Sequence, residues 1–130
     1  MKSSSTIINS AIDVLNIEIR GIKLIKKTFD NNFVSAIKEL SKVKGRVIIT
    51  GIGKSGHIAS KIASTMSSTG TPAQFCHSNE MSHGDLGVLS KKDVLIIISN
   101  SGNSSELKDT ITFARKNNIK TIGISSRLHK

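Results

Sequence analysis

Asp93 to Glu106 reads DVLIIISNSGNSSE, a segment with an apolar half and a polar half. Asp93 to Ser99 is an almost unbroken aliphatic run, which is typical of a strand buried on both faces of a parallel sheet. Ser99 to Ser105, called the serine loop below, then gathers small hydroxyl and amide side chains around Gly102. A helix is predicted next, because either of the last two serines is a good cap and apolar residues recur at helical spacing as far as Arg115.

The serine loop is interpreted as a phosphate site. Hydroxyl groups and free backbone N–H groups at the N-terminus of a helix favour a phosphate dianion. A turn that only caps the helix has the same composition, and this one loop leaves both interpretations open. Ser101, Ser104 and Ser105 are predicted to bind the phosphate, and Ser99 and Gly102 are also predicted to contact the substrate.

The bulk composition indicates one soluble domain. The chain has 130 residues, of which 37% are hydrophobic, a size that supports a single core. No apolar run reaches the roughly 18 residues that span a bilayer, so no membrane association is expected. Cys76 is the only cysteine. A lone thiol persists most easily in a reducing compartment, so we expect a cytoplasmic protein.

The formal net charge of +10 raises the question of nucleic-acid binding. The lysines and arginines are dispersed along the chain rather than clustered, and the four aromatic residues are all phenylalanine. Stacking of bases is therefore poorly supported. We expect no nucleic-acid partner, and we interpret the charge as solvated helix faces that attract small anions.

The order of the predicted elements indicates a doubly wound parallel α/β sheet. Residues 3–28 and Phe33 to Lys44 show helical spacing of apolar residues, and a further helix runs through Ile58 to Met66. We expect residues 1–45 to form helices that pack on a domain of residues 46–130. The expected strands, which share one sheet with the loops after the first and third on one edge, are Arg46–Thr50, Ala73–Cys76, Val94–Ser99 and Thr121–Ile124.

A second loop follows the first of these strands. Gly51, Gly53 and Gly56 form the pattern GxGxxG between a strand and a helix, here called the glycine loop, and this pattern is typical of dinucleotide-binding folds. Such a fold needs an acidic residue at the end of the next strand, where this chain has His77. A nucleoside-triphosphate loop would need glycine at the position of Ile48. Both nucleotide interpretations are weakened.

The same geometry serves a ligand without a nucleotide. Lys54 stands at the start of the helix and at the carboxyl end of the strand, where it can place a cation beside a small ligand at the switch point of the sheet. A solvated surface lysine is the alternative. The position of Lys54 among closely spaced glycines favours the functional interpretation.

Three segments together resemble the sugar isomerase (SIS) domain, and specifically arabinose-5-phosphate isomerases of 3-deoxy-manno-octulosonate synthesis. They read GIGKSGHIASKIASTMSSTGTP, HSNEMSHGDLG and IISNSGNSSE, in the family's order and spacing. The resemblance implies a flavodoxin-like, three-layer αβα fold after two N-terminal helices. It also implies interconversion of D-ribulose 5-phosphate and D-arabinose 5-phosphate, with a pentose 5-phosphate as ligand and a homo-oligomer, usually a tetramer.

The resemblance also implies roles for single residues. Glu106 matches the carboxylate that can act as the base of an aldose–ketose isomerisation, Lys54 the lysine that stabilises charge on the substrate, and His83 a histidine that contacts the sugar. His77 matches a position where a metal such as zinc binds, which we interpret as adventitious or inhibitory, with no cofactor required. The remaining residues expected to bind substrate are Gly53, Ser55, Gly70 and Thr71.

Two further expectations follow from the resemblance. Family enzymes continue beyond the counterpart of Lys130 with another strand, a second phosphate loop, a glutamate, a histidine and regulatory domains. We therefore expect the domain to be incomplete at its C-terminus and the 130-residue chain alone to lack turnover. SIS domains also occur in transcriptional regulators, so a non-catalytic sugar-phosphate-binding module is the alternative; the presence of both Lys54 and Glu106 favours the enzyme.

Overall fold

The computed structural model describes residues 3–82 and 84–127. The chain divides into two compact units, Met1–Ile37 and Lys38–Lys130. The boundary expected after residue 45 stays a prediction. None of the described helices has the length and hydropathy needed to cross a bilayer.

The second unit is built on four parallel strands in the order β2-β1-β3-β4. The predicted parallel sheet is confirmed, and each predicted strand end lies within one residue of the observed one. All five residues of β1 are buried, as are the first four of β3, because these central strands are covered on both faces. The strands are β1 Val47–Gly51, β2 Ala73–Phe75, β3 Val94–Ile98 and β4 Lys120–Ile124.

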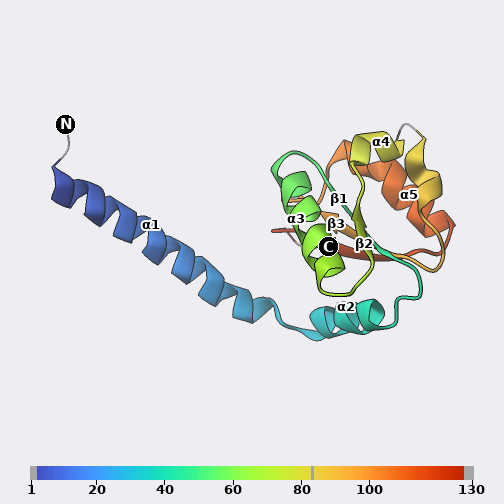
Figure 1. The fold of residues 1–130 in the computed structure, drawn as a ribbon, viewed down its shortest axis with the longest axis horizontal. Coiled ribbons are helices and arrows are strands. Elements are labelled where there is room, and N and C mark those ends of the chain that lie inside the picture. The colour runs from blue at the N-terminus through green and yellow to red at the C-terminus, as the bar shows by residue number, and fades with distance from the viewer. Residues whose placement is uncertain (1–2, 83, 128–130) are drawn as a thin grey trace. The chain divides into compact units, whose positions relative to one another are not determined.

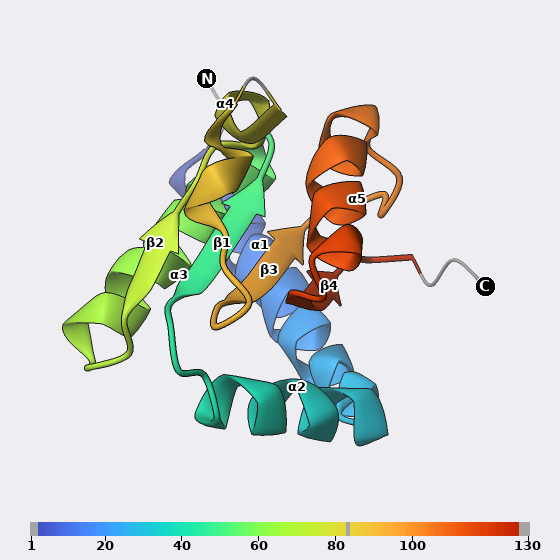
Figure 2. The same cartoon turned by 90° about the vertical axis from the view of Figure 1, so that its right-hand side faces the viewer.

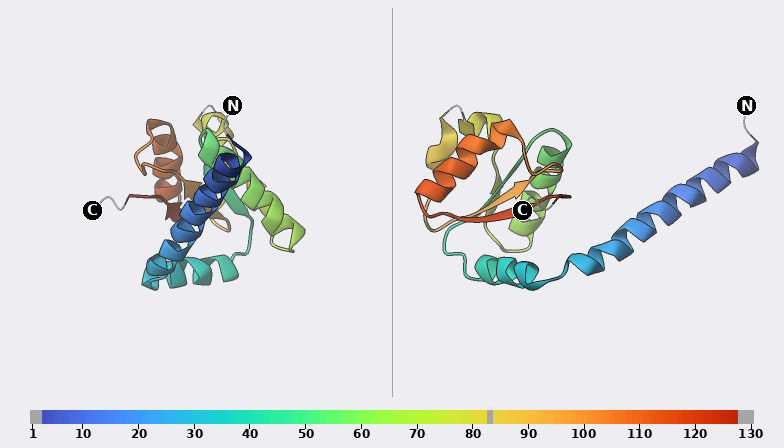
Figure 3. Two further views of the ribbon diagram at one scale, coloured as in Figure 1. Left: turned by 90° about the vertical axis from the view of Figure 1, so that its left-hand side faces the viewer. Right: turned by 180° about the vertical axis from the view of Figure 1, so that it is seen from behind.

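Helices cover both faces of the sheet, with α3 on one side and α5 on the other (Figure 2). Ala59 and Ala63 of α3 pack on Val47 and Ile49 of β1. On the opposite face, a cluster around Leu95 joins the sheet to α4 and α5, which lie side by side in Figure 1 and Figure 3. The helical segments of this unit after β1 are α3 Lys54–Ser68, α4 Ser78–Ser82, η2 Asp85–Val88, η3 Ser105–Leu107 and α5 Lys108–Lys116.

The N-terminal segment is helical, as predicted. It consists of α1 Ser4–Ile25, the 3-10 turn η1 Lys26–Thr28 and α2 Asn31–Ser41, which continues into the second unit. Asp30 separates the helices because its Oδ1 accepts the N–H groups of Asn32 and Phe33, at 2.9 and 3.1 Å. Helix α2 begins at Asn31, two residues before the predicted start at Phe33.

A buried carboxylate fixes the amino ends of the two central strands. Asp93 accepts the N–H of Arg46 at 2.7 Å and the N–H of Ser90 at 2.8 Å. Gly45 passes so close that an added Cβ would lie 2.9 Å from the Lys92 carbonyl oxygen. Burial raises the pKa of Asp93, but the hydrogen bonds from Arg46 and Ser90 outweigh this and leave the pKa below its usual value.

We expect Asp93→Asn to lower the free energy of unfolding by about 1 to 3 kcal/mol at pH 7, because a charged acceptor of two backbone N–H groups is lost. A depressed pKa stabilises the fold above the unfolded pKa and loses this effect as pH falls through the folded value. The difference between the variant and wild type should therefore shrink in acid, as measured by urea unfolding from pH 7 to pH 3. Asp13→Asn, on an exposed position of α1, is the control. A difference that does not change with pH would contradict this role.

Candidate functional site

Two loops meet at one edge of the sheet around a shallow hollow of about 280 Å³. In the β1–β3 register Gly51 lies opposite Ile98, so both strands end at the same level and release their loops side by side. The prediction that the glycine and serine loops share an edge is confirmed. The residues that line the hollow are Ile52, Ser55, Ile98, Ser99, Asn100, Ser101, Ser104 and Leu107.

The glycine loop is compact because backbone atoms of neighbouring residues occupy the space that a side chain at Gly51 or Gly56 would need. An added Cβ on Gly51 would lie 2.9 Å from the carbonyl oxygen of Ser55, and one on Gly56 would lie 2.9 Å from the carbonyl oxygen of Gly51. Gly53 has φ of +54°, a conformation that favours glycine. Helix α3 therefore begins directly against the end of β1, and Ser55 in its first turn reaches the hollow.

The serine loop is closed by its own first residue. The buried Ser99 Oγ accepts the N–H of Gly102 at 3.2 Å and lies 3.2 Å from Ser104 Oγ. Gly102 adopts φ of +70°, which lets the chain turn back on Ser99. Small hydroxyl groups are thus held around the hollow by the fold itself.

The segment after β4 also holds the serine loop, and the sequence did not indicate this. Ser126 donates to the Asn100 carbonyl oxygen twice, through its N–H at 3.2 Å and its Oγ at 2.6 Å. Ser99 N–H donates to the Ile124 carbonyl oxygen at 3.0 Å. These contacts join residues far apart in the chain, so no local pattern marks Ser126.

The predicted serine cap is wrong. Ser104 precedes the helical segment, but neither its hydroxyl nor that of Ser105 accepts a capping N–H. Ser104 Oγ lies against Ser99 instead, and Ser105 Oγ donates to Glu106 Oε2 at 3.1 Å. The segment starts as the 3-10 turn η3 and becomes α-helical only at Lys108. The polar character of the hollow therefore comes mainly from the serine hydroxyls and less from the dipole of an α-helix.

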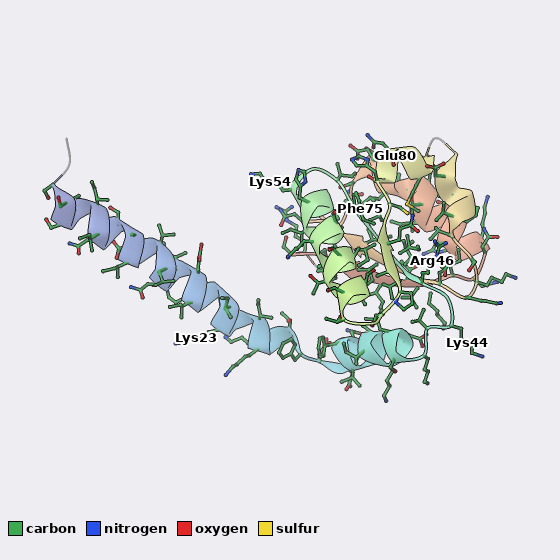
Figure 4. The ribbon with its side chains drawn as sticks, in the orientation of Figure 1. Lys23, Lys44, Arg46, Lys54, Phe75 and Glu80 are labelled. Carbon is green, nitrogen blue, oxygen red and sulfur yellow. The ribbon has the colours of Figure 1, made fainter. Side chains whose placement is uncertain are left out.

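The two predicted catalytic side chains lie at the rim. Lys54 opens α3 and is exposed, and Figure 4 shows its side chain extending away from the ribbon. Glu106 is exposed in η3, and its backbone carbonyl oxygen accepts Ser82 Oγ at 3.3 Å. Neither lines the hollow, although each lies one residue from a lining residue, Ser55 or Leu107. Gly53 and Gly102, and Ser105 at the start of η3, are also exposed and lie outside the lining.

Gly70 and Thr71 lie at the other edge of the sheet. They connect the end of α3 to the start of β2, and Thr71 N–H donates to the Met66 carbonyl oxygen at 2.9 Å. The start of a parallel strand faces the amino edge, whereas the hollow lies at the carboxyl edge. The structure therefore does not bring these two residues to the hollow within one chain.

The structure describes only one of the two predicted histidines. His83 lies outside the described residues. His77 follows β2, is half-buried, accepts the Asn79 N–H through Nδ1 at 3.4 Å and contacts the Phe75 ring edge-on. Within residues 3–82 and 84–127, no three histidine, cysteine or acidic side chains gather as a metal site would require. Zinc at His77 stays a prediction.

Curated relatives of the chain are arabinose 5-phosphate isomerases. The chain is 46% identical over 127 residues to arabinose 5-phosphate isomerase KdsD of Francisella tularensis, a match that covers 95% of this chain. It is 37% identical over 126 residues to arabinose 5-phosphate isomerase GutQ of Salmonella typhimurium, covering 97% of this chain. In both cases the chain spans only 39% of the relative's length.

Solved structures agree with this relationship. An E. coli protein crystallised in complex with arabinose 5-phosphate superimposes with a TM-score of 0.91 and 35% identity, covering 99% of this chain and 69% of that one. A sugar-phosphate isomerase-like protein of Listeria monocytogenes gives the same TM-score at 26% identity, covering 98% and 67%. Residues 39–129 match the family described as the SIS domain. The chain belongs to the SIS domain family.

Proposed function

We propose that this chain forms the sugar-phosphate-binding part of an isomerase that interconverts D-ribulose 5-phosphate and D-arabinose 5-phosphate. The observation that carries the proposal is the meeting of the glycine and serine loops around one hollow. The 46% identity to a KdsD isomerase supports the choice of substrate. The reaction moves protons within one molecule, so it needs no redox cofactor.

The phosphate is assigned to the serine loop. Ser99, Ser101 and Ser104 line the hollow, with Gly102 and Ser105 beside them on the same loop. The volume of about 280 Å³ is at the lower limit of the roughly 300 to 1,000 Å³ that is typical of small-molecule sites. Such a hollow suits one end of a small sugar phosphate.

The acid–base chemistry is assigned to the rim. An aldose–ketose isomerisation takes a proton from one carbon and returns it to the next through an enediolate. Glu106 is proposed as the base, with Lys54 stabilising the developing oxyanion and His83 contacting the sugar. Both rim side chains are long and exposed, so rotation about their side-chain bonds can turn them over a ligand seated between Ser55 and Leu107.

Gly70 and Thr71, at the amino edge of the sheet, contribute to the proposed site only if the chain forms a homo-oligomer. Gly70 and Thr71 cannot reach the hollow of their own chain, so their predicted contact with substrate requires a neighbouring copy. Their loop is held at both ends, by Thr71 N–H to Met66 and by Val47 N–H to the Pro72 carbonyl oxygen at 2.8 Å. Such a fixed loop can present the same backbone surface to a second chain.

A chimera tests the function directly. Residues 1–127 of this chain would replace the matching segment of the Francisella tularensis isomerase, which supplies the rest of the enzyme. We expect conversion of D-ribulose 5-phosphate to arabinose 5-phosphate at about 1 per second or more, as for an ordinary enzyme. The alternative of a non-catalytic sugar-phosphate module predicts that the chimera folds and binds arabinose 5-phosphate without turnover, a result that would overturn the proposal.

The phosphate assignment predicts a loss of affinity in Ser104→Ala. Removing a hydroxyl that bonds a charged group should weaken arabinose 5-phosphate binding to the 130-residue chain by about 1 to 3 kcal/mol in calorimetry. Ser60→Ala, on an exposed turn of α3, is the matched control and should bind as wild type does. Equal affinities for all three proteins would show that the serine loop does not bind the phosphate.

The rim assignment predicts an effect on the chemical step. In the chimera, Lys54→Ala and Glu106→Gln should each lower kcat about 100- to 10,000-fold, with a much smaller change in KM, because acid–base and oxyanion contributions appear in the transition state. Lys61→Ala removes an exposed lysine from the same helix as Lys54 and should leave kcat unchanged. Wild-type kcat in either variant would show that the substituted residue is only a solvated side chain.

A further inference from the structure

Helix α4 contacts the turn that carries Glu106 through two neighbouring residues. Ser82, the last residue of α4, donates its hydroxyl hydrogen to the Glu106 carbonyl oxygen at 3.3 Å. The preceding residue, Met81, is fully buried and belongs to the same apolar cluster as Leu107, which follows Glu106. Ser82 and Glu106 are 24 positions apart in the chain, so no local sequence pattern marks this contact.

Helix α4 gives the contact a firm support. Ser78 at its start and Met81 near its end are both fully buried. Met81 donates its N–H to the His77 carbonyl oxygen at 3.1 Å, and its side chain packs in the cluster that contains Leu95 of the central strand β3. The short helix is therefore anchored in the core beside the sheet.

The turn η3 has few restraints of its own. It consists of three residues, Ser105–Leu107, and a 3-10 turn has poorer hydrogen-bond geometry than an α-helix. The peptide group between Glu106 and Leu107 is held from both ends: its N–H donates to the Ser104 carbonyl oxygen at 3.2 Å, and its carbonyl oxygen accepts the Ser82 hydroxyl. Fixing this peptide group fixes the direction in which the exposed Glu106 side chain leaves the backbone.

A purely local role for the Ser82 hydroxyl is the alternative. The same hydroxyl donates to the Ser78 carbonyl oxygen at 3.1 Å, four residues earlier in α4, a bond that serine makes within helices. Because a hydroxyl has one hydrogen, the two carbonyl oxygens share it. Ser10, in the other compact unit, makes the same local bond to the Thr6 carbonyl oxygen at 2.9 Å and is a matched comparison.

We propose that Ser82 is a positioning residue for Glu106: its hydroxyl holds the turn that carries the proposed base against α4. The inference rests on the proposed function, because Ser82 acts only through Glu106. A base that takes a proton from carbon must lie within reach of that proton, and a displacement of about 1 Å can cost about 100-fold in rate. Ser82 itself lies outside the lining of the hollow, so it positions the base without binding the substrate.

The test is a double-mutant cycle in the chimera. We expect Ser82→Ala to lower kcat about 10-fold with little change in KM, and Ser82→Thr, which keeps a hydroxyl, to restore most of the rate. In the Glu106→Gln background, Ser82→Ala should change kcat by less than about 2-fold, because the carboxylate through which it acts is already lost. Ser10→Ala should leave kcat unchanged in both backgrounds.

Amide hydrogen exchange in the 130-residue chain gives a readout that does not depend on activity. Ser82→Ala should speed exchange of the Leu107 N–H about 3- to 10-fold, and Ser10→Ala should not. Unchanged exchange at Leu107, or a full 10-fold effect of Ser82→Ala on kcat in the Glu106→Gln background, would overturn the proposal while the wild-type chimera stays active. A wild-type chimera without turnover would instead overturn the proposed function, and the role of Ser82 with it.

Discussion

The pairing of β1 with β3 is the constraint on which the site depends. Because Gly51 lies opposite Ile98, the two strands end at the same level and their loops leave from one edge. The approach is possible only because Gly51 has no side chain: a Cβ there would lie 2.9 Å from the Ser55 carbonyl oxygen and 3.0 Å from that of Ile98. Asp93 fixes the other end of the same two strands through the N–H groups of Arg46 and Ser90.

The proposed function assigns binding and chemistry to different parts of this arrangement. The hydroxyls of the serine loop are held by Ser99 inside the loop and by Ser126 from beyond β4, so they are positioned before any ligand arrives. Lys54 and Glu106 stand on the rim, exposed and joined to the same two loops. A fixed polar floor with movable charged side chains at its edge suits a reaction in which a phosphate anchors the substrate while protons move at the other end.

The sequence predicted the parts of the structure that depend on local patterns. Unbroken aliphatic runs identified β1 and β3, and the glycine spacing placed the start of α3 against β1. The Ser99–Ser104 contact and the 3-10 start of the helix depend on how the serine loop closes on itself, which composition alone does not specify. The role of Ser126 depends on a contact between segments far apart in the chain, so it had no local signal. The amino-edge position of Gly70 and Thr71 did have one, because a loop between a helix and a following parallel strand lies at that edge.

The most direct test of the central claim is a nuclear magnetic resonance titration of the 15N-labelled 130-residue chain with arabinose 5-phosphate. The account predicts saturable shifts concentrated on the amides of residues 51–55 and 99–107, with inorganic phosphate reproducing only those of residues 99–107. Saturable shifts confined to other surfaces, or shifts that grow linearly without saturation, would contradict it.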